Sequence, residues 1–423
     1  MPEILDLKYD KYTLKNGLEV ILHKNDTLPL VAVNLWYKVG SANETKGKTG
    51  FAHLFEHMMF QGSKNVPKEM HFRYIQEAGG TLNGSTSLDR TNYYETVPSN
   101  SLELALWLES DRMGFLLPAL TEEKLQNQKD VVMNERRQRY DNQPYGRAWE
   151  TIFSNLYPNT FPYHWPTIGW MEDIEKFKLD DVKEFFGKFY TPNNASLVVA
   201  GNFEYNEAEK LIENYFSEIP AGPEISSEIY FKPVLEENIE TVLEDNVQLP
   251  RIYLTWVSEK LYGTDDAALD ILSDILSGSK GSRLHKLLVH DKQIAQDVSC
   301  YQYSSVLSGS FIIAATAKPG VALSELQKLI FLEIENVIKN GVTERELQRA
   351  RNNFESSFIY SLQNIDMISD QLNNYNCNLG KPNMFNYDLE RYSQLSPENI
   401  KEAALKYLSK PYVQLSVLPK RKK

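Results

Sequence analysis

The sequence predicts an α+β protein of two homologous halves, each a mainly antiparallel sheet with helices packed on one face. Two observations support this fold class. Four segments recur in the same order at a nearly constant offset, which indicates a duplication. In both copies, strand-like runs are interleaved with helical runs, a pattern typical of helices layered on an antiparallel sheet.

The four recurring segments extend over most of each copy. They are LPLVAVNLWYKV and LPRIYLTWVSEK from Leu28 and Leu249, FQGS and LSGS from Phe60 and Leu276, the Thr-Glu pairs at Thr121 and Thr343, and VKEFFGKFYTPNNASLVV and IKEAALKYLSKPYVQLSV from Val182 and Ile400. The offset drifts slightly from one segment to the next, as insertions in surface loops would produce.

Each copy is expected to contain the same elements: a strand pair, a helix, further strands, long helices and a closing strand. The further strands are expected within Asn83–Val97 and Val298–Ala317. The stretch Ile219–Glu240 is rich in proline and acidic residues, which is typical of a linker. We therefore expect an N-terminal domain over residues 1–230 and a homologous C-terminal domain over residues 231–423.

Composition excludes several classes of protein. The net charge of −12 over 423 residues argues against a nucleic-acid-binding surface, which needs a basic stripe for phosphates. The only cysteines are Cys300 and Cys377, so a disulfide framework and a thiolate zinc site are both excluded. No apolar run approaches the length of a transmembrane segment. The N-terminus lacks the pattern of a signal peptide, so we expect a cytoplasmic protein, or a periplasmic one if a signal was removed.

A short motif in the first copy carries the chemistry. His53 and His57 are four residues apart in the segment FAHLFEHMMFQGS, so on a helix both imidazoles project from one face. Two neutral imidazoles at this separation can bind one Zn²⁺. Glu56 is close enough to reach a water on such a metal and to accept its proton. Because the flanking residues are apolar, this helix is expected to be buried.

A catalytic zinc site needs a third protein ligand and one open position. The candidate is Glu135, in the strongly helical stretch Leu125–Asp141. Val131 and Val132 lie one helical turn before it, which puts Glu135 on or beside the apolar face of that helix. A carboxylate in such a place needs a cation.

The duplication supplies an internal control. When Phe60 is aligned with Leu276, the three motif positions are occupied by Leu269, Leu272 and Ser273 in the second copy. When Thr121 is aligned with Thr343, Ser357 takes the place of Glu135. The C-terminal copy therefore lacks the metal ligands while keeping the framework. The fold does not need histidine or glutamate at these places, so their role in the first copy is chemical.

The motif and its surroundings resemble the pitrilysin/insulinase family of zinc peptidases, whose signature is the inverted order H-x-x-E-H. GFAHLFEHMMFQGS carries the signature, and VVMNERRQRYDNQP carries the distal glutamate at a spacing close to that of the family. The resemblance implies His53, His57 and Glu135 as ligands of one Zn²⁺, and Glu56 as general base. It also implies two similar halves that close like a clam shell round a peptide. Compact bacterial members, which are similar to the subunits of the mitochondrial processing peptidase, are the nearest in pattern.

The segment Gly79–Pro98 resembles the family's substrate-binding edge strand. An exposed strand edge can pair with an extended peptide through main-chain hydrogen bonds. Asn83, Gly84, Ser85 and Thr86 would then line the peptide-binding cleft. The alternative is a plain hairpin with its polar residues facing solvent.

Two positions depart from the family pattern. Many members carry another acid two helical turns before the third ligand, where this chain has Gln128. Complete members also have an Arg and a Tyr in the second half that bind the substrate carbonyl, and the matching segment LVHDKQIAQDV has Val289 and Gln296 there. Some relatives divide these roles between two subunits. The resemblance therefore implies a dimer, and favours the zinc-bearing subunit of a heterodimer with a homologous Arg/Tyr-bearing partner.

The resulting prediction is a zinc-dependent endopeptidase, a hydrolase that cuts peptides or unfolded segments. Two alternatives stay open. The chain could be a non-catalytic scaffold or peptide-binding subunit that retains a relic zinc site, although relatives of that sort tend to lose the signature. It could also hydrolyse a non-peptide amide, which the four residues alone allow.

Overall fold

A computed structural model describes residues 5–225 and 230–420 of the chain. It divides into two compact units, each assembled from three stretches of sequence. Unit 1 comprises Met1–Arg136, Trp165–Glu228 and Phe358–Asn386, and unit 2 comprises Arg137–His164, Ile229–Ser357 and Tyr387–Lys423. Part of the expected linker, residues 226–229, lies outside the described residues.

Unit 1 contains a six-stranded sheet. In spatial order its strands are β1 (Asp10–Thr13), β2 (Glu19–Lys24), β6 (Ala195–Gly201), β3 (Leu30–Tyr37), β5 (Thr91–Pro98) and β4 (Thr81–Thr86). The pair β2–β6 is parallel, and the other neighbouring strands are antiparallel. Its helices are α1 (Phe51–Met58), α2 (Met70–Glu77), α3 (Leu102–Phe115), α4 (Glu122–Arg136), α6 (Met171–Ile174), α7 (Leu179–Phe189), α8 (Tyr205–Phe216) and α12 (Ile365–Leu379).

Unit 2 repeats this plan in a five-stranded sheet. Its strands, in spatial order, are β7 (Ile239–Asp245), β11 (Val413–Pro419), β8 (Arg251–Ser258), β10 (Gly309–Ala317) and β9 (Ala295–Ser304). The first pair is again parallel and the rest are antiparallel. The remaining described α-helices are α5 (Ala148–Leu156), α9 (Asp266–Ser277), α10 (Leu323–Asn340), α11 (Glu344–Ser361), α13 (Phe385–Ser393) and α14 (Pro397–Leu408). The same strand order and directions in both sheets confirm the duplicated α+β fold.

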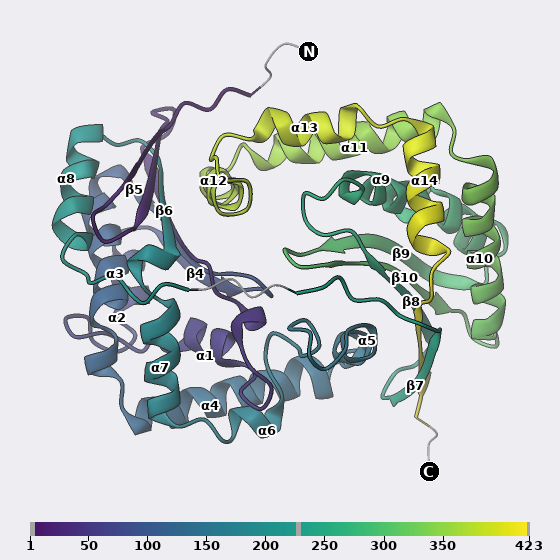
Figure 1. Ribbon diagram of the computed structural model, residues 1–423, viewed down its shortest axis with the longest axis horizontal. Helices are drawn as coiled ribbons and strands as arrows, with labels where there is room; N and C mark the ends of the chain where they lie inside the picture. The colour runs from purple at the N-terminus through teal and green to yellow at the C-terminus, as the bar shows by residue number, and fades with distance from the viewer. Residues whose placement is uncertain (1–4, 226–229, 421–423) are drawn as a thin grey trace. The chain divides into compact units, whose positions relative to one another are not determined.

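The two faces of the first sheet are covered by different helices (Figure 1). The face formed by Leu35 and its cross-strand partner Tyr93 is buried beneath helices that include α1 and α3. The opposite face is covered by α12, where Trp36 Nε1 donates to Asp370 Oδ1 at 2.9 Å and Asn373 Nδ2 donates to the Asn34 carbonyl at 2.9 Å. The expected helical layer is therefore present, and the structure adds one helix on the other face.

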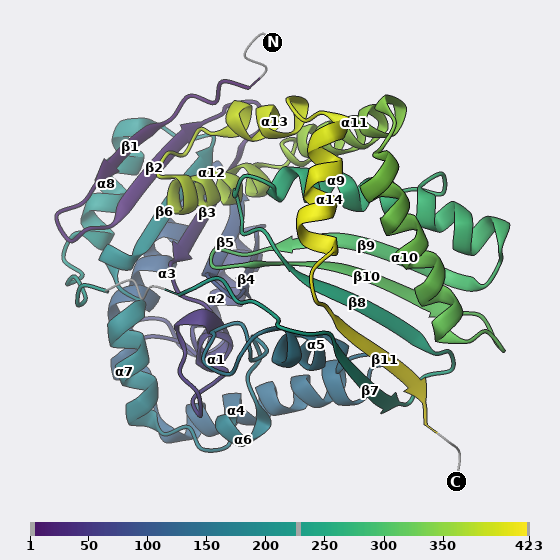
Figure 2. The ribbon, with the colours of Figure 1, turned by 45° about the vertical axis from the view of Figure 1, so that its right-hand side comes forward.

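Helices α5 and α12 are exchanged between the two halves of the sequence. Helix α12 lies in the second half of the sequence but packs on β3 and β6, whereas α5 lies in the first half but packs on β8 and β11 (Figure 2). The two helices begin at Ala148 and Ile365, a separation that matches the offset of the repeat, so they are counterparts in the duplication. Each sheet is completed by the other half's copy of the same helix.

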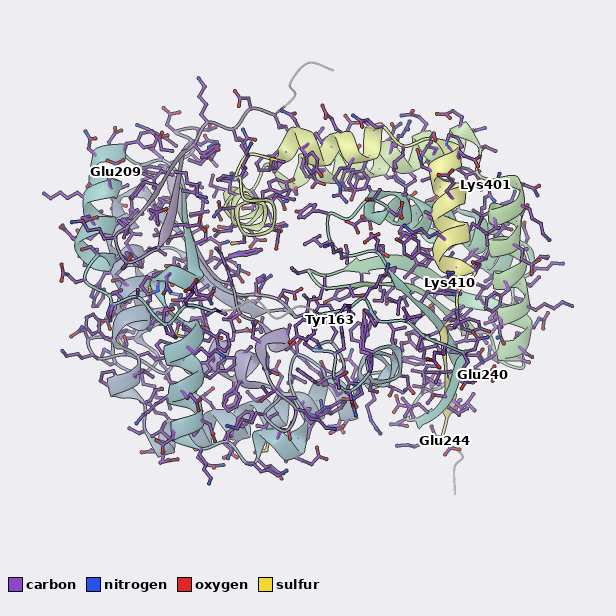
Figure 3. All side chains as sticks on the ribbon, in the orientation of Figure 1. Tyr163, Glu209, Glu240, Glu244, Lys401 and Lys410 are labelled. Carbon is purple, nitrogen blue, oxygen red and sulfur yellow. The ribbon has the colours of Figure 1, made fainter. Side chains whose placement is uncertain are left out.

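The outer edges of the two sheets differ. Strand β1 covers the edge of β2, but among the described residues no strand pairs with the corresponding edge of β7. Figure 3 labels Glu240 and Glu244 on β7, and both side chains are exposed. Charged side chains on an edge strand discourage pairing with other chains. Within the described ranges, no helix is long and apolar enough to cross a membrane.

Candidate functional site

Helix α1 begins at a sharply turned, buried N-terminus. The Glu44 carboxylate accepts hydrogen bonds from the backbone N–H groups of Gly50 and Ala52, both at 2.8 Å. Burial raises the pKa of Glu44 well above its usual range, while these two hydrogen bonds oppose the shift. Gly50 has φ 99°, and a Cβ there would lie 2.7 Å from the Ile168 carbonyl oxygen. Only glycine fits this approach, so the start of α1 is fixed within unit 1.

One side of α1 packs on aromatic rings. Phe51 stacks on Phe177 with ring centroids 3.9 Å apart, and Phe55 lies 5.0 Å from Tyr190. This packing turns the motif residues toward α4 and β4. The His53 and His57 rings lie side by side with centroids 4.9 Å apart, as the i, i+4 spacing predicts.

Helix α4 presents Glu135 to these imidazoles. It is anchored by Lys129, whose buried ammonium donates to the carbonyls of Glu175 at 2.7 Å and Phe177 at 3.3 Å. Glu135 Oε2 then lies 3.1 Å from His57 Nε2, and Oε1 lies 3.7 Å from His53 Nε2. Residues far apart in the sequence are thus brought together by the packing of α1 on α4.

The chemistry of this donor set fits a zinc ion. His53, His57 and Glu135 each offer one ligand atom, and the three atoms lie within 4.8 Å of one another. Tetrahedral Zn²⁺ with bonds of about 2.0–2.1 Å separates its ligand atoms by roughly 3.3 Å. The distances between Glu135 and the two imidazoles bracket this value. Two imidazole nitrogens and one carboxylate oxygen also leave a fourth position for a reacting molecule.

Glu56 points to the neighbouring strand. Its Oε2 accepts a hydrogen bond of 2.6 Å from the Thr86 hydroxyl at the end of β4. Its Cγ lies against the backbone of Gly84, where an added Cβ would be 3.3 Å away. The fourth motif residue therefore lies between α1 and β4.

Strand β4 has one edge free among the described residues, because it pairs only with β5. The Gly84 N–H donates to Asn83 Oδ1 at 2.9 Å, and the Ser85 hydroxyl donates to Asn92 Oδ1 at 2.7 Å. All four predicted substrate-binding residues, Asn83 to Thr86, lie on this edge strand beside the motif helix. Their binding of a peptide stays a prediction.

Tyr93, which no sequence motif singled out, supports both α1 and β4. Its hydroxyl donates to the Phe55 carbonyl at 3.2 Å, and its ring lies opposite Gly84 in the register of β4 and β5. The Arg112 guanidinium lies over the Tyr93 ring, 4.2 Å from its centroid. Counting residues back from the turn of the expected hairpin would have paired Gly84 with Tyr93 and identified this contact.

The structure also locates the three residues that depart from the family pattern. Val289 lies in the π-helical segment His285–Asp291 and packs against the core of unit 2. Gln296 is an exposed residue of β9. Gln128 is buried on α4. Neither Val289 nor Gln296 offers the cationic and phenolic donors expected at these two positions.

Comparison with known proteins bears on the whole chain. Residues 19–163 match the family model described as Insulinase (Peptidase family M16), and residues 176–354 match the model described as Peptidase M16 inactive domain. The zinc protease PqqE of Helicobacter pylori is 32% identical over 372 residues, which cover 87% of this chain and 83% of PqqE. A probable mitochondrial-processing peptidase subunit beta of Arabidopsis thaliana is 22% identical over 424 residues, covering 96% and 77% of the two chains.

The fold has a similar solved structure. A crystal structure of a protease from Helicobacter pylori matches with a TM-score of 0.91 at 29% identity, covering 98% of this chain and 100% of that chain. The pattern of two similar halves, each a sheet with packed helices, is therefore shared across the full length.

Proposed function

The chain belongs to the insulinase family, peptidase family M16, and from this premise we propose that it is a zinc-dependent endopeptidase that hydrolyses peptides or unfolded segments. The observation that carries the proposal is the convergence of His53, His57 and Glu135 within 4.8 Å, with Glu56 on the same helix turned to an edge strand. A purely structural helix pair has no use for this arrangement. Relatives named as zinc proteases support the same reading.

His53, His57 and Glu135 would hold one Zn²⁺. A zinc ion in such a site supplies Lewis acidity, which polarises a carbonyl and makes water acidic enough to lose a proton near neutral pH. The protein's own part is to hold the two imidazoles at a fixed angle on α1 and to bring the carboxylate of α4 to them. The half-buried setting keeps these side chains in place before substrate arrives.

Glu56 would act as the general base. Its carboxylate accepts a proton from the attacking water and then passes it to the leaving amine nitrogen. An extended peptide would pair with the free edge of β4 along Asn83–Thr86, because an edge strand offers main-chain donors and acceptors. This pairing would bring the scissile bond next to Glu56, which already contacts β4.

We further propose that the chain is the zinc-bearing subunit of a two-subunit enzyme. Val289 and Gln296 occupy the positions at which complete relatives carry the donors that stabilise the oxyanion. Such donors are worth about 2.7–4 kcal/mol each in other enzymes. A homologous partner that carries Arg and Tyr would restore them. The similarity to a protein named as a processing peptidase subunit supports this arrangement.

The test is cleavage of a quenched extended peptide by the purified, zinc-loaded chain, alone and with a homologous Arg/Tyr-bearing partner. We expect one zinc per chain and a large gain in turnover when the partner is added. Glu56→Gln should lower kcat by about 10²- to 10⁴-fold without loss of zinc. Full activity in Glu56→Gln would overturn the assignment of the base. A zinc-loaded chain that stays silent with every partner would favour the non-catalytic scaffold.

A further inference from the structure

We propose that Thr86 is a positioning residue, whose hydroxyl fixes the carboxylate of Glu56 for proton transfer and does not donate to the peptide. The inference rests on the proposed function of Glu56 as general base. It changes the role of one of the four residues expected to line the cleft. It also makes the substrate strand part of the machinery that aligns the base.

The hydroxyl of Thr86 donates a hydrogen bond to Glu56. Its Oγ1 lies 2.6 Å from Glu56 Oε2, a distance typical of a strong hydrogen bond to a carboxylate. Both side chains are half-buried, so solvent competes only partly for this bond. Because the hydroxyl has a single proton, donating it to Glu56 leaves no donor for a substrate carbonyl.

Gly84, on the same strand, contacts the aliphatic part of the Glu56 side chain. Gly84 and Thr86 are two residues apart on β4, so they face the same side of the sheet, toward α1. A Cβ at Gly84 would lie 3.3 Å from Glu56 Cγ and 3.1 Å from the Tyr93 ring. Glycine therefore lets the backbone of β4 contact the Glu56 methylene groups, while the Thr86 hydroxyl binds the Glu56 carboxylate.

Tyr93 joins the hairpin β4–β5 to α1 beside this contact. Tyr93 lies opposite Gly84 in the sheet, and its hydroxyl donates to the carbonyl of Phe55, the residue before Glu56. Helix α1 and the hairpin β4–β5 are thus tied together at both the backbone and the side chain of the base. A peptide paired to the free edge of β4 would be placed by the same strand that places Glu56. The register of the substrate and the position of the proton acceptor would then be set by one element.

The experiment compares Thr86→Val, which keeps the shape and removes the donor, with Thr86→Ser, which keeps the donor. Thr81→Val is the matched control, because Thr81 is an exposed residue of the same strand and faces the opposite side of the sheet. The variants are assayed in whichever assembly, chain alone or with its partner, supports turnover. We expect Thr86→Val to lower kcat by about 10-fold or more, as for a lost hydrogen bond to a charged group, with little change in KM. Thr86→Ser and Thr81→Val should keep most of the activity.

A double-mutant cycle with Glu56→Gln separates positioning from other effects. If Thr86 acts through Glu56, adding Thr86→Val to Glu56→Gln should not lower the residual rate further. Additive losses, a change confined to KM, or failure of Thr86→Ser to rescue would each overturn the proposal.

Crystal structures of the wild-type protein and of Thr86→Val give a readout that does not need activity. The Glu56 carboxylate should occupy one position in the wild type and several in the variant, and an unchanged single position would overturn the inference. Absence of Glu56-dependent turnover in the wild type would instead reject the proposed function, so the two failures are distinguishable.

Discussion

The helix pair α1 and α4 in unit 1 and its counterpart α9 and α11 in unit 2 occupy equivalent places in the duplicated fold, yet different side chains lie in them. At the motif positions, α9 carries Leu269 and Leu272, both completely buried in the core of its unit. In α1 the corresponding side chains are imidazole and carboxylate groups. An apolar core therefore suffices for this fold.

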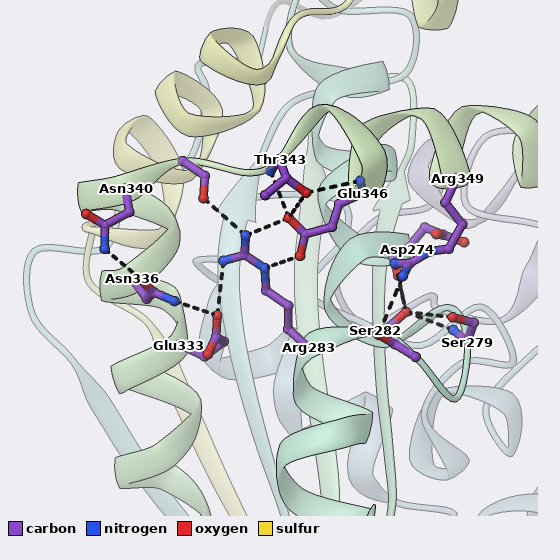
Figure 4. A network of polar contacts seen from close by, with 12 residues as sticks. Asp274, Ser279, Ser282, Arg283, Glu333, Asn336, Asn340, Thr343, Glu346 and Arg349 are labelled. Carbon is purple, nitrogen blue, oxygen red and sulfur yellow. Dashed lines mark hydrogen bonds and ion pairs between the residues drawn. The ribbon is translucent and has the colours of Figure 1, made fainter.

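In unit 2, polar side chains form contacts beside α9 and α11 (Figure 4). Asn353 Nδ2 donates to Asp274 Oδ2 at 3.2 Å. Beside them, Arg283 forms hydrogen bonds of 2.7 and 2.8 Å with Glu346 and of 3.1 Å with Glu333. In the second unit, the cation that meets the carboxylates of Glu333 and Glu346 is a side chain of the protein, Arg283. In the first, a carboxylate meets two imidazoles, which is the set that a divalent cation completes.

The largest expected difference between the pairs is the effect of removing the acid from α4. Glu135→Gln should abolish zinc binding and lower kcat/KM by more than about 10³-fold, since the metal contributes several kcal/mol to catalysis. Its counterpart Ser357→Ala should change neither. Zinc content by mass spectrometry and peptide turnover measure both. A Glu135→Gln variant that keeps stoichiometric zinc would contradict the ligand set.

A second expected difference concerns stability. Leu272→Ala should lower the free energy of unfolding by about 2–5 kcal/mol, because it leaves a cavity in the core of unit 2. The zinc content should stay at one per chain. Urea unfolding and metal analysis together test this. Loss of zinc in this variant would show that the two units are not chemically independent.

Removal of zinc by a chelator should destabilise α1 and α4. Removing zinc that is held at about 100 to 1,000 times its Kd lowers stability by about 3–4 kcal/mol. Hydrogen exchange followed by mass spectrometry should show faster exchange in α1 and α4, with α9 and α11 unchanged. Equal loss of protection in both pairs would argue against a metal site confined to unit 1.

A smaller effect is expected on the edge strands. Gly84→Ala should reduce stability by about 1–3 kcal/mol through overpacking against Tyr93 and Glu56. The corresponding register position of β9 is Gln302, opposite Phe311, and it already carries a full side chain. Gln302→Ala should leave zinc content and turnover unchanged. Thermal unfolding and peptide turnover of the two variants measure these effects.

The smallest effect comes from the ion pair of unit 2. The hydrogen bonds from Arg283 lower the pKa of Glu346 from 4.5 to about 2. Because the folded pKa is the lower one, the stabilisation is complete above pH 4.5 and is lost as the pH falls toward 2. Glu346 is partly exposed, so we expect on the order of 1 kcal/mol. Urea unfolding of the wild type and of Glu346→Gln across this range should show the acid-dependent part only in the wild type.

Periodicity and repetition predicted the elements that local sequence controls. The i, i+4 spacing of His53 and His57 placed both rings on one face, and the repeat offset predicted the matching strands of the two sheets. Glu135 needed more than spacing, because it lies far from His57 in the sequence and only packing joins them. Helix α1 contacts α4 directly, and Lys129 holds α4 to the carbonyls of Glu175 and Phe177. No local pattern encodes these contacts.

Two features of the structure could not be predicted in this way. An amphipathic pattern tells that a helix has an apolar face but not which sheet covers it, so the exchange of α5 and α12 was not foreseen. The hydrogen bond from Thr86 to Glu56 joins a strand end to a helix and depends on their exact approach. Gly84 marked that approach, since glycine inside a strand often indicates close contact with another element.

The exchange of α5 and α12 has a consequence for synthesis on the ribosome. The strands of the first sheet are complete once Gly201 has been made, but the helix that covers one of its faces begins at Ile365. At about 5–20 residues per second, that face waits on the order of ten seconds for its cover. During this interval Trp36 and Asn34 lack their partners on α12. The nascent chain therefore cannot finish unit 1 until α12, which lies in the second half of the sequence, has been made.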